Sequence, residues 1–435
     1  MVRIIICFLA FLFSFILNLL HAQQYYYWKN DIKLDLQPIP DKNFVVTTIG
    51  NPELLAQQLA LSSNAVKTLS KVVVPKSIEE SIQVDQSMVN LYWAFLECSL
   101  SLKNSQNNDI IYTAPFFRIN GKEVGISQFF YVKLRQQSDY SVLEKLAQEN
   151  NVKIEGRSKF MPLWYILSCT NRSTGNALEM ANLFYETGMF ASSQPDLMSS
   201  FKMNNGFSAN TKFSKRLTTA KIPLDSHLRL DDWTPDPYFQ DQWHLSNTGQ
   251  YGGIVGTDIN ILPAWDITTG CNSIIVAVVD EGLEINHPDF NNILTTSYDA
   301  ETGTSPSQVH GNHGVAVAGI IGATANNGIG VAGVAPDVKL MSISVELGVA
   351  APLTSLKLSD GINFAWQNGA HVINNSWASD AITSQQLIIE PLTMRYFLGV
   401  GVWGLLWFLP LGMITCRVFI SPPAIVMFCR RHEYV

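Results

Sequence analysis

The feature that most constrains the fold is a continuous apolar run over Ser273–Val279 that ends on Asp280. A strand that is apolar on both faces suits the interior of a parallel sheet with helices packed on both sides. The pattern predicts two further strands and two helices after it, at 338–345 and 371–376 and at 314–325 and 360–366. We therefore predict an α/β fold with a doubly wound parallel sheet in this part of the chain.

Polar side chains at the ends of these strands are candidates for chemistry, because ligands gather at the carboxyl ends of parallel strands. Asp280 and Ser376 lie at two such ends, and His313 follows Asp280 by 33 residues. A buried carboxylate can accept the Nδ1 proton of an imidazole and stabilise the imidazolium formed when the ring takes a proton from a hydroxyl. We therefore predict that Asp280 orients His313 for acid–base catalysis.

Three sequence blocks around these residues resemble the subtilisin-like serine proteases (subtilases, peptidase S8 family). The family's D-[ST]-G block is Asp280-Glu281-Gly282 here, closer to the D-D-G of the kexin-like branch, and H-G-T-x-V-A-G is H-G-V-A-V-A-G over 313–319. S-[LWF]-G appears as Ser376-Trp377-Ala378. Their order and spacing match the family's Asp, His, Ser chain order. The departures are Glu281, the Val at position 315 and Ala378.

This resemblance implies a serine-type endopeptidase that acts on polypeptide substrates. Asp280 would orient His313, and His313 would be the general base. Ser376, Trp377 and Ala378 would form an edge strand that binds the substrate backbone by hydrogen bonds.

The resemblance also implies a structural calcium ion, with ligands from the side chains of Asp289 and Asn327, and no catalytic cofactor. Hard oxygen donors on two loops suit calcium. His310 and His313 could instead suggest a metal pair, but the motif offers no acidic third ligand. We interpret His310, together with His287 and His371, as structural or solvated.

Two strand-helix-strand patterns precede this domain over residues 128–200 and predict a small α+β, ferredoxin-like domain. The resemblance implies that it is a propeptide that inhibits the enzyme intramolecularly until it is cleaved. Residues 201–233 are polar and predict an exposed linker with a processing site. Residues 234–389 would be the N-terminal part of the catalytic domain, whereas nothing indicates the role of 23–127.

The two ends of the chain are apolar. Residues 1–22 have the layout of a secretory signal peptide, which predicts a secreted, periplasmic or cell-surface protein. In the tail, 390–435, the stretch 396–416 carries no charge and lies between Arg395 and Arg417, which is long enough to span a bilayer. A membrane is an expected partner only if this tail is read as written.

The nucleophilic serine is expected in a G-T-S-x-A turn about 160 residues after His313, which is beyond residue 435. Residues 382–435 also contain no Asn for the oxyanion hole. In a shifted reading frame, the codons allowed for 390–428 can spell a helix, a buried strand and a Gly-Asn pair. We therefore predict a frame shift near Ile388 to Glu390, ahead of a truncated domain and of a genuine anchor, and no peptidase activity for the chain as written.

Charge excludes some partners and leaves one rival function. The net charge is −7, and no basic block stands out beyond Arg430-Arg431, so nucleic acid is not an expected partner. Only 15% of the residues are charged, which suits a polar, uncharged surface. The rival function is a non-catalytic, membrane-anchored binding protein on the same scaffold.

Overall fold

The computed structural model describes residues 25–29, 31–79, 90–98, 108–119, 121–198, 201–203, 236–379, 387–388, 390–391, 401–404, 414–421 and 424–431. The expected signal peptide and nearly all of the expected linker lie outside these residues. The chain divides into two compact units. The first comprises residues 1–70, 91–153 and 167–195, and the second comprises 71–90, 154–166 and 196–435.

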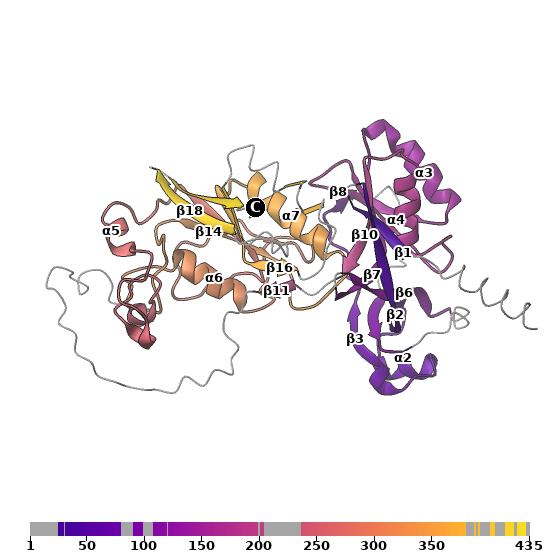
Figure 1. The fold of residues 1–435 in the computed structure, drawn as a ribbon, viewed down its shortest axis with the longest axis horizontal. Helices are drawn as coiled ribbons and strands as arrows, with labels where there is room; N and C mark the ends of the chain where they lie inside the picture. Colours follow the sequence, from indigo (N-terminus) through magenta and orange to yellow (C-terminus); the bar gives the residue numbers. More distant parts are fainter. Residues whose placement is uncertain are drawn as a thin grey trace, which may run out of the picture. The chain divides into compact units, whose positions relative to one another are not determined.

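The second unit, in which Figure 1 labels β14, α6 and α7, is built on a five-stranded sheet in the order β13-β14-β12-β15-β17. Each neighbouring pair is parallel. The strands are β12 (Ile275–Asp280), β13 (Tyr298–Asp299), β14 (Lys339–Ser344), β15 (Val372–Asn375) and β17 (Gly401–Gly404). The predicted α/β fold with a parallel sheet is therefore confirmed.

Helices α6 (His313–Gly322) and α7 (Thr354–Gln367) pack against opposite faces of this sheet. Ala277 and Val279 of β12 belong to one buried cluster with residues of α7. Val276 and Val278 belong to another, with Ala318 of α6. Because consecutive residues of a strand point to opposite faces, both faces of β12 must be apolar, which explains the continuous apolar run.

The carboxyl edge of the sheet is polar and its register is regular. Asp280 at the end of β12 is paired with Ser344 of β14, and Ser344 is paired with Asp299 of β13. All three side chains are at most 1% exposed. Two carboxylates and a hydroxyl therefore stand at neighbouring strand ends.

The first unit is a largely antiparallel sheet with helices. Its strands are β1 (Tyr25–Lys29), β2 (Ile32–Thr47), β3 (Val66–Lys71), β5 (Tyr92–Leu96), β6 (Ile110–Ile119), β7 (Lys122–Lys133) and β10 (Ser192–Met198), and its helices are α2 (Pro52–Gln58), α3 (Tyr140–Glu149) and α4 (Ala177–Glu186). Phe130 and Phe184 stack edge to face at 5.2 Å and join α4 to β7. The expected domain boundary at residue 128 falls inside β7, since β6 and β2 continue the same sheet.

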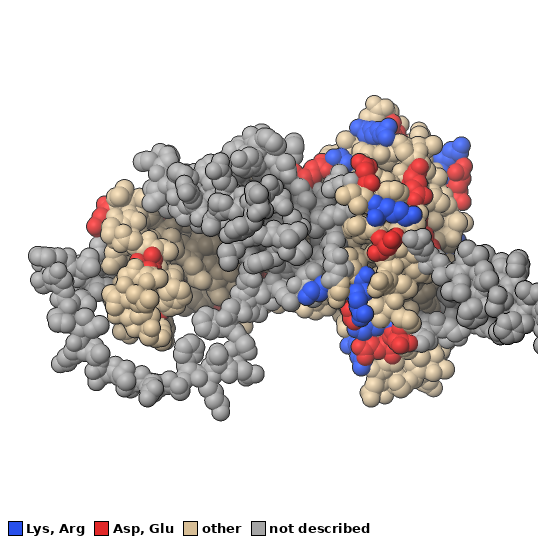
Figure 2. Space-filling model, viewed as in Figure 1, with Lys and Arg blue, Asp and Glu red and all other residues tan. Residues whose placement is uncertain are grey.

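Charges of both signs are interspersed on the face of this unit that Figure 2 shows. Lys67 and Glu97, for example, form an ion pair at 3.1 Å. A mixed surface of this kind does not present the single-sign field that binds a polyanion.

Two short stretches of the N-terminal region belong to the second unit. They carry β4 (Ile78–Glu79), most of β8 (Lys153–Ser158) and the start of β9 (Trp164–Ser168), and β4 pairs antiparallel with β8. Asp360 of α7 is fully buried and accepts hydrogen bonds from the hydroxyls of Ser77 at 2.5 Å and Ser158 at 3.4 Å. Burial raises the pKa of Asp360 to about 7 despite these hydrogen bonds.

The apolar tail is described only in part, and apart from residues 390–391, which are helical, the described parts are strands. Besides β17, they are β18 (Ile414–Ser421) and β19 (Ala424–Arg431), which pair antiparallel. Among the residues that the structure describes, no helix has both the length and the apolar character needed to cross a membrane.

Candidate active site

Asp280 and His313 lie in direct contact. Nδ1 of His313 is 2.9 Å from Oδ1 and 3.0 Å from Oδ2 of Asp280. The Asp280 carboxylate is fully buried and also accepts the backbone N–H of Glu281 at 2.8 Å. The structure thus brings together the two residues that the sequence pairs.

His313 is the first residue of α6, and its side chain is 11% exposed. The hydrogen bond to Asp280 raises the pKa of His313, and this effect outweighs the lowering caused by burial. No hydrogen bond within the described residues occupies Nε2 of this ring. A histidine held at Nδ1 by a carboxylate, with Nε2 available, has the arrangement of a general base.

Glu281 ties the turn before His313 to the end of β12. Its backbone oxygen accepts the N–H of His310 at 2.7 Å, and its Oε2 accepts the N–H of His313 at 3.2 Å. Gly282 has φ +94°, and a Cβ there would lie 2.1 Å from the backbone oxygen of Gln308. Glu281 is 5% exposed and is therefore a buried anchor of this turn. Its position in the D-[ST]-G block did not predict this role.

The last two residues of the block Ser376-Trp377-Ala378 lie in an extended strand. Strand β16 (Trp377–Ser379) pairs antiparallel with β11 (Phe201–Met203), with Ala378 opposite Lys202. The Trp377 side chain is buried and donates from Nε1 to the backbone oxygen of Val279 at 3.0 Å. With the Trp377 side chain buried, the contact between β16 and β11 is a backbone pairing.

The predicted calcium ligands also lie together. Oδ1 of Asp289 accepts from the Asn327 side-chain amide at 2.9 Å, and Oδ2 accepts a backbone N–H at 2.9 Å. Asp236 is buried and accepts three backbone N–H groups of residues 326–328 at 2.9 Å each. No sequence motif marks this residue. Hard oxygen donors suit calcium.

As arranged, however, these oxygens are occupied by N–H donors. In the described part of the chain, no group of three or more His, Cys, Asp or Glu side chains is placed to hold a metal. A calcium ion would require Asn327 to turn its amide oxygen toward Asp289. The loop is thus held by hydrogen bonds. Asp289 and Asn327 are residue types that suit calcium, but their present orientation does not direct free oxygens at an ion.

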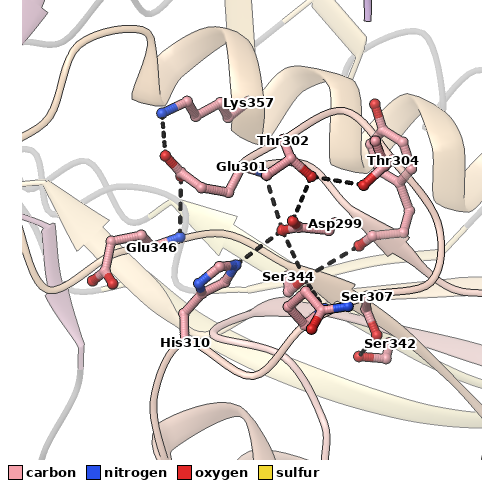
Figure 3. Close-up of polar contacts among 12 residues, drawn as sticks. Asp299, Glu301, Thr302, Thr304, Ser307, His310, Ser342, Ser344, Glu346 and Lys357 are labelled. Carbon is pink, nitrogen blue, oxygen red and sulfur yellow. Dashed lines mark hydrogen bonds and ion pairs between the residues drawn. The ribbon is translucent and has the colours of Figure 1, made fainter. Parts of the chain in front are cut away.

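A second Asp–His pair stands beside the first. Nε2 of His310 is 2.9 Å from Oδ1 of Asp299, and Figure 3 shows the polar side chains around them. The sequence predicts a structural or solvated role for His310, and it contains no signal that marks Asp299. Because β13 has only two residues, no apolar run marks its end.

Comparison with known proteins agrees with this geometry. Residues 272–395 match the model of the subtilase family, Peptidase_S8. The "PC3-like endoprotease variant B" of Hydra vulgaris is 36% identical over 130 residues, which are 28% of this chain and 18% of that protein.

Two bacterial proteins show similar identity. The "Thermophilic serine proteinase" of a Bacillus species is 34% identical over 156 residues, 35% of each chain. The "Calcium-dependent protease" of Trichormus variabilis is 34% identical over 143 residues, 32% of this chain and 20% of that protein. This chain therefore spans well under half the length of each of these relatives. Its residues 272–395, which contain Asp280, His313 and the Ser376 block, belong to the subtilase family.

Proposed function

We propose that this chain carries the orienting carboxylate and the general base of an exported subtilisin-like serine endopeptidase. The observation that carries the proposal is the contact of His313 Nδ1 with both oxygens of the buried Asp280 carboxylate. Nε2 of His313 would take the proton of an attacking serine hydroxyl, and the Asp280 carboxylate would stabilise the resulting imidazolium.

The substrate class is a polypeptide in extended conformation. The antiparallel pairing of residues 201–203 with β16 supports this proposal, because it is the mode in which a substrate strand would bind. Residues 201–203 follow β10 closely in the chain. The segment 128–200 would therefore be continued by a strand that occupies the position of the substrate beside β16. We assign residues 128–200 the role of an intramolecular inhibitor.

The proposed reaction also requires an attacking serine. No G-T-S-x-A motif follows His313 within the 435 residues. We expect this polypeptide to hydrolyse no peptide bond by itself, and we expect the serine to be encoded in another frame past Ile388 to Glu390. Nucleotide sequencing past codon 390 tests this, since absence of G-T-S-x-A in the second frame would contradict it.

A fluorophosphonate probe tests the same proposal on the protein. The chain as written should show no labelling, because the probe reacts with an activated serine. A polypeptide translated in the second frame should be labelled, and His313→Ala in that longer form should abolish labelling. Labelling of the chain as written would contradict the proposal.

We further propose that Asp289 and Asn327 bind a structural calcium ion, after the Asn327 amide turns. The name of the Trichormus relative states calcium dependence of that protein, which supports the proposal. Calcium should raise the melting temperature of this chain relative to a chelator, whereas the Asp289→Asn variant should not respond. Equal melting temperatures of the unchanged chain in both conditions would contradict a calcium site.

A further inference from the structure

The ends of two strands on either side of β14 each hold a histidine of the same short turn. Asp280 binds His313, and Asp299 binds His310, three residues earlier in the chain. The two aspartates flank Ser344 in the sheet register. The turn 310–313 is therefore held to the sheet by two ring-to-carboxylate contacts.

Asp299 is bonded more completely than a surface carboxylate would be. It is 1% exposed and accepts from His310 at 2.9 Å, from the Thr302 hydroxyl at 2.6 Å and from the Ser344 hydroxyl at 3.1 Å (Figure 3). Burial raises the pKa of Asp299, but the hydrogen bonds from His310, Thr302 and Ser344 outweigh it, so the net shift is downward. Asp299 stays ionised and offers His310 a fixed charge.

The hydrogen bond to Asp299 in turn raises the pKa of His310 against the lowering effect of burial. The other acidic groups facing His310 are Glu301 and Glu346. Lys357, whose side chain is 2% exposed, is paired with Glu301 at 2.5 Å. Within the cluster of Figure 3, the direct partner of the His310 ring is therefore Asp299.

Backbone contacts connect this pair to the candidate active site. The N–H of His310 donates to the backbone oxygen of Glu281, the residue after Asp280. The N–H of Gln308 donates to the Ser344 hydroxyl at 3.0 Å. The turn is thus fixed at the His310 N–H to the residue that follows β12 and at the Gln308 N–H to β14, and a displacement of His310 would be passed along the turn to His313.

We propose that His310 and Asp299 are a positioning pair that holds the His313 ring against Asp280. This inference rests on the proposed function, in which His313 is the general base. The pair acts through the backbone of the turn and touches neither substrate nor proton in transit.

The test is NMR of the full chain with labelled histidine, which observes the His313 Nδ1 proton shared with Asp280. His310→Ala should speed solvent exchange of this proton about tenfold, the effect of losing one charge-assisted hydrogen bond. His310→Gln, whose amide can still reach Asp299, should restore most of the protection. The control is His371→Ala, because His371 is exposed and lies at the opposite, amino end of β15.

A second measurement compares pH profiles. As pH rises, exchange of the His313 Nδ1 proton should accelerate more in the unchanged chain than in His310→Gln, because hydroxide catalysis acts on both proteins but only the unchanged chain also loses the His310 proton. A folded His310→Ala protein with unchanged exchange, or exchange indifferent to the titration of His310, would overturn the positioning pair. Absence of a protected His313 Nδ1 proton in the unchanged chain would count against the proposed function itself, so the two failures are distinguishable.

Discussion

The ends of β12 and β13 carry the same pair of residue types in two different states. At β12, His313 uses Nδ1 for Asp280, and no partner within the described residues binds its Nε2. At β13, Asp299 accepts from a ring and two hydroxyls, so its carboxylate is fully engaged. The two pairs use different ring nitrogens: His313 binds Asp280 through Nδ1 and presents Nε2, whereas His310 binds Asp299 through Nε2. We therefore treat the first pair as the proposed acid–base site and the second as a clamp.

Replacing the two carboxylates should lower the free energy of unfolding by different amounts. Asp299→Asn should cost about 3 kcal/mol in the free energy of unfolding, because it removes a buried charge on which three side-chain donors converge. Asp280→Asn should cost about 1 kcal/mol, since one ring and one backbone N–H depend on it. Urea unfolding at pH 6 measures both values. Equal losses at the two positions would contradict the distinction between clamp and acid–base site.

Asp360 of α7 can be compared with Asp280 and Asp299, because it is a buried carboxylate that accepts from two hydroxyls and from no histidine among the described residues. Its pKa is about 7 in the folded chain against an ordinary value of 3.8, so folding favours its protonated form. Its contribution to stability is therefore lost as pH rises from about 4 to about 7. Asp360→Asn, which has no charge to bury, should be more stable than the unchanged chain above pH 7 by about 2 kcal/mol.

Thermal unfolding at pH 4.5 and at pH 8 checks this prediction. The two proteins should differ little at the lower pH and clearly at the higher pH. A difference in melting temperature that is the same at both pH values would show that Asp360 does not carry a burial penalty.

A smaller effect is expected on how the stabilisation by the His310–Asp299 pair, the clamp, depends on pH. The pKa of His310 is raised above 6.5, so its stabilisation is complete below pH 6.5 and is lost above it, as the folded protein releases the proton. The pKa of Asp299 is lowered below 3.8, so its stabilisation is present above pH 3.8 and is lost as pH falls further. The pair should therefore stabilise most between these limits.

His310→Gln should flatten the alkaline side of this window by about 1 kcal/mol, because its amide does not titrate. Urea unfolding in steps from pH 5 to pH 9 compares it with the unchanged chain. Parallel curves for the two proteins would indicate that His310 does not titrate against Asp299.

The long elements and one of the two Asp–His pairs could be predicted from the sequence. The run that ends on Asp280 marks a buried strand, and helix α6 (His313–Gly322) lies where the pattern predicts a helix over 314–325. Asp299 could not be predicted, because a two-residue strand has no periodicity and its partner depends on sheet register. The positions of residues 201–203 on β16 and of Ser77 beside Asp360 also depend on contacts between distant segments, which local patterns do not encode.

The contact with Asp280 should raise the pKa of His313, which is proposed to be the general base. An NMR titration of the His313 ring, in the unchanged chain and in Asp280→Asn, tests it most directly. We expect a pKa above 6.5 in the unchanged chain and a clear decrease in the variant, because the hydrogen bond that His313 donates to Asp280 is the largest cause of the shift. The same pKa in both proteins would contradict the claim.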